Sequence, residues 1–161
     1  MVGPMRQDQK TVEIMGGIHG TLAAVYGATY KAHTMRHFPA IVKAYRYLRT
    51  VLNTGGKELV VFKPIRGGVH GCFFTSGKIF IDPRGDIRRI TETLAHEMVH
   101  AEQYNTGKME RIPFNPHVRI WQGNPHPIQY RTYHEYRALP WEAEAFARQE
   151  ELAAAALKGV L

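Results

Sequence analysis

The segment His96-Glu97-Met98-Val99-His100 carries two histidines four residues apart, with a glutamate directly after the first. In an α-helix, residues four apart lie on one face, one turn above the other, so the two imidazoles can share a metal ion. Imidazole is a preferred zinc ligand, and Glu97 would be close enough to take a proton from a water molecule that the zinc activates. The H-E-x-x-H pattern therefore predicts the helix of a zinc hydrolase, with Glu97 as general base.

The residues around the motif have the periodicity and the end signals of a helix. Asp86 follows the turn Pro83-Arg84-Gly85 and suits an N-cap, and Asn105-Thr106-Gly107 supplies a C-terminal stop. Apolar residues at steps of three and four predict one buried stripe: Ile87, Ile90, Leu94, Met98 and Ala101. The opposite face carries polar residues: Glu92, His96, His100 and Gln103. The competing interpretation is a surface helix with two solvated histidines.

Length and composition indicate one globular domain spanning residues 1–161. Of the 161 residues, 44% are apolar and 22% charged, which is enough to bury a core without cross-links. The single cysteine, Cys72, excludes an internal disulfide, and we interpret it as a packing residue in a strand. Neither a secretory signal nor a membrane-length apolar run is visible in the sequence, so we expect a cytoplasmic protein without a membrane partner.

The formal net charge is +7, but the basic residues are scattered along the chain. Arg84, Arg88 and Arg89 come nearest to a cluster, and no nucleic-acid-binding motif is present. We interpret the charge as a solvated basic surface. At most, it predicts weak and nonspecific contact with nucleic acid, lost near physiological salt.

The expected fold class is α+β, with N-terminal helices before a small sheet. A first helix is predicted from apolar residues at helical spacing, although neighbouring glycines weaken the prediction. These residues are Ile14, Ile18, Leu22 and Val25. A second helix is predicted to begin near Phe38-Pro39, because proline suits a first helical position, and to end at Asn53-Thr54-Gly55-Gly56. Its buried stripe would consist of Ile41, Ala44, Tyr45, Leu48 and Leu52.

Three runs rich in β-branched and aromatic residues predict a small, mostly antiparallel sheet: residues 58–63, 69–75 and 78–82. Ser76-Gly77 predicts a hairpin between the last two, and the last strand feeds into the histidine helix. Residues 109–122 could add one or two strands, and residues 124–127 are predicted to be a loop. Pro140 is expected to open a second strong helix.

Catalytic zinc usually takes three protein ligands, so one more must come from outside the motif. The longer pattern H-E-x-x-H-x-x-G-x-x-H is not present, since Gln103 and Thr106 occupy the places of its glycine and last histidine. The candidates lie further along the chain: His117, His126, His134, Glu142 and Glu144. On a helix opened by Pro140, Glu144 points about 200° away from Glu142, so the two cannot face one ion equally.

Two segments together carry a family resemblance. The motif 96–100, followed by Pro140-Trp141-Glu142-Ala143-Glu144-Ala145, resembles the gluzincin class of zinc metallopeptidases, in particular small SprT-like and ImmA/IrrE-like members. In that class a glutamate on a later helix completes the metal site. The resemblance covers roughly residues 78–148 and does not include the N-terminal helices.

The resemblance implies a zincin-like domain that binds Zn²⁺ and hydrolyses peptide bonds of a protein or peptide substrate. The implied ligands are His96, His100 and Glu142, and the implied base is Glu97. Phe146 departs from the pattern, because ImmA/IrrE-type relatives often have Asn or Asp there. SprT proteins proper use a histidine as third ligand, which keeps His117 as an alternative.

A metal site also needs groups that orient the imidazoles and stabilise the developing oxyanion. Gln103 and Glu92 share the histidine face and are candidates for the first role. Candidates for the second role precede Pro140: Tyr133, His134 and Tyr136. The rival function is a zinc-binding regulatory or nucleic-acid-associated protein on the same scaffold without turnover. The complete H-E-x-x-H motif favours hydrolysis, because a structural zinc site does not need the base.

Overall fold

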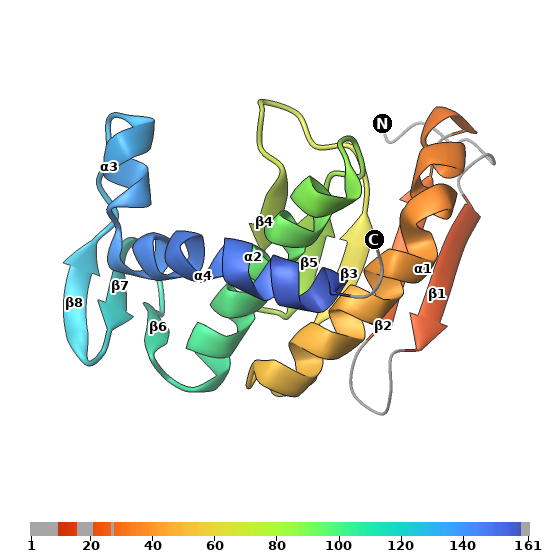
Figure 1. Cartoon of the computed structure of the whole chain (residues 1–161). Helices are drawn as coiled ribbons and strands as arrows, with labels where there is room; N and C mark the ends of the chain where they lie inside the picture. Colours follow the sequence, from red (N-terminus) through yellow and green to blue (C-terminus); the bar gives the residue numbers. More distant parts are fainter. Residues whose placement is uncertain (1–9, 16–20, 27, 159–161) are drawn as a thin grey trace.

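The computed structural model describes residues 10–15, 21–26 and 28–158, and within them the architecture is α+β, as predicted (Figure 1). The strands are β1 (Lys10–Met15), β2 (Thr21–Tyr26), β3 (Leu59–Phe62), β4 (Gly71–Phe73), β5 (Lys78–Ile81), β6 (Met109–Ile112), β7 (Asn115–Trp121) and β8 (Asn124–Pro127). The helices are α1 (Ala28–Val51), α2 (Ile87–Asn105), α3 (Tyr133–Arg137) and α4 (Pro140–Leu157). None of these helices contains an apolar stretch of membrane-spanning length.

The larger sheet is mixed and has the strand order β1-β2-β3-β5-β4. Its two central pairings, β2 with β3 and β3 with β5, are parallel, and the outer pairings are antiparallel. The prediction of a mostly antiparallel sheet is wrong here. Helix α1 is the crossover that makes β2 and β3 parallel, and β3 and β5 are parallel because the chain first forms β4 at the sheet edge and then returns as β5 between them. One face of β3 and β5 supplies core residues: Val60, Phe62, Ile79 and Ile81.

The strands predicted at 58–63, 69–75 and 78–82 are confirmed as β3, β4 and β5. The hairpin at Ser76-Gly77 is also confirmed, since β4 and β5 pair antiparallel on either side of it. Gly77 has a φ of 92°, a conformation that glycine adopts without steric cost. The hairpin leaves β4 at the edge of the sheet, beside α2.

Helix α2 begins and ends where the sequence predicts. Asp86 is its N-cap, and the carboxylate accepts a hydrogen bond from the Arg89 backbone N–H at 2.8 Å. The predicted apolar stripe is buried: Ile87, Ile90, Leu94, Met98 and Ala101. The histidine face is buried as well, because α4 crosses over α2 and α1 (Figure 1). Both faces of α2 are therefore held by packing.

The predicted first N-terminal helix is wrong. Its residues Ile14, Leu22 and Val25 lie in β1 and β2, which pair antiparallel with Ile14 opposite Leu22; Ile18 lies outside the described residues. Thr11, Val12 and Ile14 are β-branched and favour a strand. The partner that holds β2 in place, β3, lies beyond α1, so a local spacing could not reveal it.

The second N-terminal helix is confirmed, but it does not begin at Phe38-Pro39. Helix α1 runs from Ala28 to Val51, and Pro39 lies exposed inside it. An internal proline removes one backbone hydrogen bond, a cost of about 3 kcal/mol. The predicted stripe is buried in the core and offsets this cost: Ile41, Ala44, Tyr45, Leu48 and Leu52.

A small antiparallel sheet, β6-β7-β8, lies with α3 beyond the end of α4 (Figure 1). The strands predicted within 109–122 are thus β6 and β7. The loop predicted at 124–127 is wrong, because these residues form β8. Pro125 and Pro127 cannot donate ladder hydrogen bonds, but an edge strand tolerates proline. Helix α4 begins at Pro140, as predicted.

Candidate metal centre

Three buried side chains from two helices meet at one point. His96 and His100 come from α2, and Glu142 comes from the first turn of α4. Nε2 of His96 lies 3.0 Å from Oε2 of Glu142, and Nε2 of His100 lies 3.3 Å from Oε1. The two Nε2 atoms are 3.2 Å apart. Metal-binding sites are built from clusters of His, Cys, Asp and Glu side chains, and within the described residues this is the one such cluster whose ligand atoms could hold an ion.

Nδ1 of His100, the ring nitrogen that does not face Glu142, is hydrogen-bonded to Gln103. The Gln103 amide nitrogen donates to the Trp141 carbonyl at 3.0 Å and to the Glu144 carboxylate at 2.9 Å. Its oxygen therefore faces His100, and Nδ1 of His100 donates to it at 2.8 Å. In the neutral ring this leaves the lone pair on Nε2, directed at Glu142 and His96. A metal-binding histidine needs this tautomer.

His96 has an equivalent contact, but its partner comes from α4. Nδ1 of His96 lies 2.9 Å from Oε1 of Gln149. The Phe146 ring packs edge-on against the His96 ring, with centroids 4.5 Å apart. Phe146 thus limits the ring's rotation, and Gln149 supplies the polar contact. The sequence analysis missed Gln149; the available signal was its position seven residues after Glu142, on the same helix face.

The other ligand candidates are not brought into this group. Glu144 accepts hydrogen bonds from Gln103 and, at 2.5 Å, from Lys108. The histidines among the ligand candidates lie on β7, β8 and α3: His117, His126 and His134. Glu92, a candidate for orienting an imidazole, pairs instead with Arg88 at 3.1 Å. Of the two predicted orienting residues, only Gln103 contacts a motif histidine.

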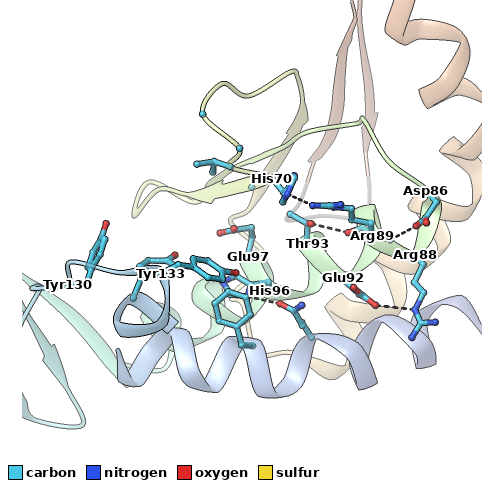
Figure 2. Close-up of a pocket in the computed structure, with 17 residues that line it drawn as sticks. His70, Asp86, Arg88, Arg89, Glu92, Thr93, His96, Glu97, Tyr130 and Tyr133 are labelled. Atoms are coloured by element: carbon cyan, nitrogen blue, oxygen red, sulfur yellow. Dashed lines mark hydrogen bonds and ion pairs between the residues drawn. The ribbon is translucent and has the colours of Figure 1, made fainter. Parts of the chain in front are cut away.

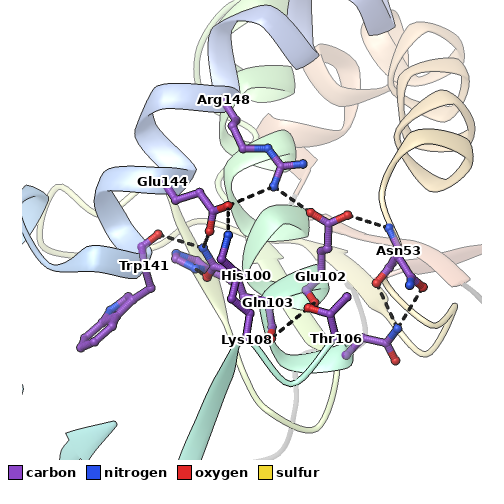
Figure 3. A network of polar contacts seen from close by, with 10 residues as sticks. Asn53, His100, Glu102, Gln103, Thr106, Lys108, Trp141, Glu144 and Arg148 are labelled. Carbon is purple, nitrogen blue, oxygen red and sulfur yellow. Dashed lines mark hydrogen bonds and ion pairs between the residues drawn. The ribbon is translucent and has the colours of Figure 1, made fainter. Parts of the chain in front are cut away.

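A polar network behind Gln103 joins α2 to α4 and to the end of α1 (Figure 3). Arg148 on α4 pairs with Glu102 at 2.7 Å and lies 3.7 Å from Glu144. The other Glu102 oxygen accepts a hydrogen bond from the Asn53 backbone N–H at 2.8 Å. These contacts hold α2 and α4 in register, so that Glu142 is presented to the two histidines.

A cavity of about 780 Å³ opens beside the centre (Figure 2). His96 and Glu97 line it, and no group in the described part of the chain hydrogen-bonds to the Glu97 carboxylate. Gly71 on β4 makes room for this carboxylate, because a Cβ there would lie 2.8 Å from Oε1 of Glu97. The chain therefore keeps an unpaired acidic group at the cavity wall, next to three potential metal ligands.

Burial, hydrogen bonds and charges within the centre shift three pKa values. Burial opposes ionisation of Glu142, but hydrogen bonds from His100 and His96 lower its pKa to about 2. Burial also opposes protonation of His100, yet the hydrogen bond and negative charge of Glu142 raise its pKa to about 9. Burial raises the pKa of Glu97, and the two histidines oppose that effect. The group thus holds a proton at neutral pH, in the place where a divalent cation would bind.

Two of the three residues proposed for oxyanion stabilisation line the cavity: Tyr133 and Tyr136. Burial, together with the charge of Glu142 and a hydrogen bond to it, raises the pKa of Tyr136, so its hydroxyl keeps its proton. His134 is not among the lining residues. Tyr136 is therefore a hydroxyl donor beside Glu142, the third member of the candidate ligand group.

Comparisons with known proteins do not assign this centre. The chain matches no protein-family model, no curated protein and no solved structure. Its chemistry must be inferred from its own residues: three buried donors that could hold a metal ion, and a second carboxylate that faces a cavity.

Proposed function

We propose that this protein is a cytoplasmic, zinc-dependent peptidase with a zincin-like domain of the gluzincin type. One observation carries the proposal: the ligand group His96, His100 and Glu142 lies beside an unpaired Glu97 at a cavity wall. A site with a purely structural metal has no use for that buried carboxylate, whose desolvation costs free energy.

The geometry of the ligand group fits zinc. For tetrahedral coordination with zinc–nitrogen distances near 2.0 Å, ligand atoms lie about 3.3 Å apart. The two Nε2 atoms are 3.2 Å apart, and they lie 3.0 and 3.3 Å from different oxygens of Glu142; with one ligand atom from each residue, the three atoms lie within 4.8 Å of one another. Two neutral imidazoles and one carboxylate, with a fourth position left for water or substrate, form a known catalytic zinc ligand set.

The proposed reaction is hydrolysis of a peptide bond in the cavity. Bound zinc would lower the pKa of water to about 7 and polarise the substrate carbonyl. Glu97 would accept a proton from the attacking water and deliver it to the leaving amine nitrogen as the carbon–nitrogen bond breaks. The Tyr136 hydroxyl donates its single proton to Glu142 in the structure; with Glu142 bound to the metal, it would turn that proton to the carbonyl oxygen as negative charge develops there. The cavity volume of about 780 Å³ suits a peptide segment of a few residues.

Metal analysis and a peptidase assay on the same sample test this function. We expect one zinc ion per chain, and loss of most of it in the His96→Ala/His100→Ala double variant. A library of quenched fluorescent peptides should be cleaved, with activity removed by a chelator and restored by zinc. Full zinc content in the double variant would refute the metal assignment. Bound zinc without cleavage of any peptide would favour a binding or regulatory role.

Zinc binding should also release a proton. Because the pKa of His100 is raised from 6.5 to about 9, this ring is protonated at neutral pH before the metal binds. The ion must displace that proton, so apparent zinc affinity should rise with pH and level off near 9. Calorimetry in buffers with different ionisation enthalpies should give about one proton released per zinc at about pH 7.5. Heats that do not depend on the buffer would contradict this expectation.

A further inference from the structure

One end of the cavity carries a guanidinium group without a carboxylate partner. Arg89 lines the cavity, and its side chain reaches from α2 to the ring of His70 (Figure 2). A guanidinium has only donors, so Nε2 of His70 accepts this hydrogen bond. Within the described ranges, no other side chain accepts a hydrogen bond from the Arg89 guanidinium. Most of its N–H groups therefore remain available to a ligand.

The contact with His70 holds Arg89 in place. The backbone carbonyl of His70 accepts a hydrogen bond from the Asp82 N–H at 2.8 Å, which ties the loop before β4 to the end of β5. The neighbouring cation, Arg88, is different, because Glu92 one turn later neutralises it at 3.1 Å. The carboxylate of Asp86 is occupied as the N-cap of α2. Asp86 adds a negative charge at this end of the cavity, but its carboxylate bonds the Arg89 backbone N–H, and within the described residues the Arg89 guanidinium itself forms no ion pair.

Arg89 also lies at a defined distance from the metal centre. It precedes His96 by seven residues on α2, which is two helical turns and about 10 Å along the axis, on nearly the same face. An extended peptide rises by about 3.3 Å per residue. For a substrate that runs along α2, a peptide bond at the centre would therefore place a group about three residues away next to Arg89.

We propose that Arg89, positioned by His70, binds a carboxylate of the substrate about three residues from the scissile bond. Arginine and carboxylate form paired, charge-assisted hydrogen bonds, and the exposed Arg89 guanidinium is open to an incoming substrate. The carboxylate belongs either to an acidic side chain or to the C-terminus of a short peptide. The inference rests on the proposed peptidase function, because the position of the scissile bond is set by the metal centre.

A positional scan tests the proposal. Starting from a cleaved peptide, a single Glu is moved through each position on both sides of the scissile bond, with Gln at the same position as the neutral control. We expect kcat/KM to be about tenfold higher for Glu than for Gln at the third residue, and nearly equal at the first and second. A second pair of peptides ends at the third residue, one with a free C-terminal carboxylate and one with an amide. Comparing them distinguishes recognition of a chain terminus from recognition of a side chain.

Two variants with the same change in net charge provide the matched control. Arg89→Gln should abolish the preference for Glu, whereas Arg88→Gln should retain it. Arg89→Glu should reverse it, so that Lys is preferred at the same position. Equal kcat/KM for Glu and Gln at every position would overturn the proposal while leaving the peptidase function intact. A preference that Arg88→Gln removes equally would also overturn it, because the cause would then be general charge.

A binding measurement separates this proposal from the proposed function. Zinc-loaded Glu97→Gln protein should bind the labelled Glu peptide about tenfold more tightly than the Gln peptide by fluorescence anisotropy, and the Arg89→Gln exchange should remove this difference. Selective binding by the Glu97→Gln variant, together with no cleavage of any peptide by the wild-type protein, would leave the carboxylate site standing and refute hydrolysis. Cleavage without selective binding or selective turnover would refute the carboxylate site alone.

Discussion

Glu97→Gln should leave zinc bound and lower peptide hydrolysis by about 10² or more. Glutamine keeps the size of the side chain and its hydrogen-bonding capacity but cannot accept the proton of the attacking water. In the structure Glu97 faces the cavity and is not part of the ligand group, so its exchange removes the base without removing a ligand. Zinc content by elemental analysis and kcat on the same preparation provide the test.

Glu92→Gln is the matched control for this experiment. Glu92 lies on the same helix and lines the same cavity, but it pairs with Arg88. Its exchange should change kcat by no more than about twofold, since an exposed ion pair contributes little. If Glu97→Gln retains full kcat, Glu97 is not the base. If it loses the metal, Glu97 belongs to the ligand group.

Gly71→Ala tests the position of the same carboxylate from the opposite side. A Cβ at residue 71 would lie 2.8 Å from Oε1 of Glu97 and 2.6 Å from Cγ2 of Thr93, so both side chains would have to move. Zinc should remain bound while kcat falls by about tenfold or more, because a general base acts only within hydrogen-bonding distance. In a Glu97→Gln background the same exchange should have little further effect. An equal fall in kcat in both backgrounds would show that Gly71→Ala does not act through the Glu97 carboxylate.

The histidine helix could be predicted completely because its signals are local. The N-cap Asp86, the apolar stripe and the terminating Gly107 all lie within or next to α2, and all of them agree with the structure. From residue spacing alone, the third member of the ligand group was one of several alternatives, and only the family resemblance selected Glu142. Glu142 lies 46 residues after His96, and no periodicity in α2 indicates which element covers its polar face.

The contacts between α2 and α4 were outside the reach of local patterns. Phe146 occupies a place where ImmA/IrrE-type relatives often have Asn or Asp, and it packs on the His96 ring; the polar contact to His96 comes from Gln149, one turn further along α4. Gln103 was predictable because it shares a helix face with both histidines. The Glu144 and Trp141 groups that orient its amide were not, since they depend on how the two helices are placed together.

The errors near the N-terminus have the same origin. The spacing of Ile14, Leu22 and Val25 fits a helix, but pairing of β2 with β3 across the 24 residues of α1 selects strands. The same holds for β8, where Pro125 and Pro127 indicated a loop. In the structure β7 supplies the partner strand, and the position at the sheet edge accommodates both prolines.

Glu142→Gln and Glu144→Gln should separate a metal ligand from a neighbouring carboxylate. Glu142 lies 3.0 and 3.3 Å from the two histidine Nε2 atoms, and its pKa of about 2 keeps it ionised at neutral pH. Its replacement by a neutral amide removes a charged ligand, so zinc affinity should fall by about 10² or more and activity should fall with it. Competition with a chromophoric chelator measures the affinity, and circular dichroism checks that both variants fold.

Glu144→Gln should have a much smaller effect, of about tenfold or less, because Glu144 acts on the centre only through Gln103. Its main partner is Lys108, at 2.5 Å, and Gln103 would keep its second acceptor, the Trp141 carbonyl. The variant that loses more zinc affinity identifies which of the two glutamates is the metal ligand. If Glu144→Gln loses the metal and Glu142→Gln retains it, α4 binds the ion through a different face. If both retain it, a residue outside this group, such as His117, is the third ligand and the gluzincin assignment is wrong.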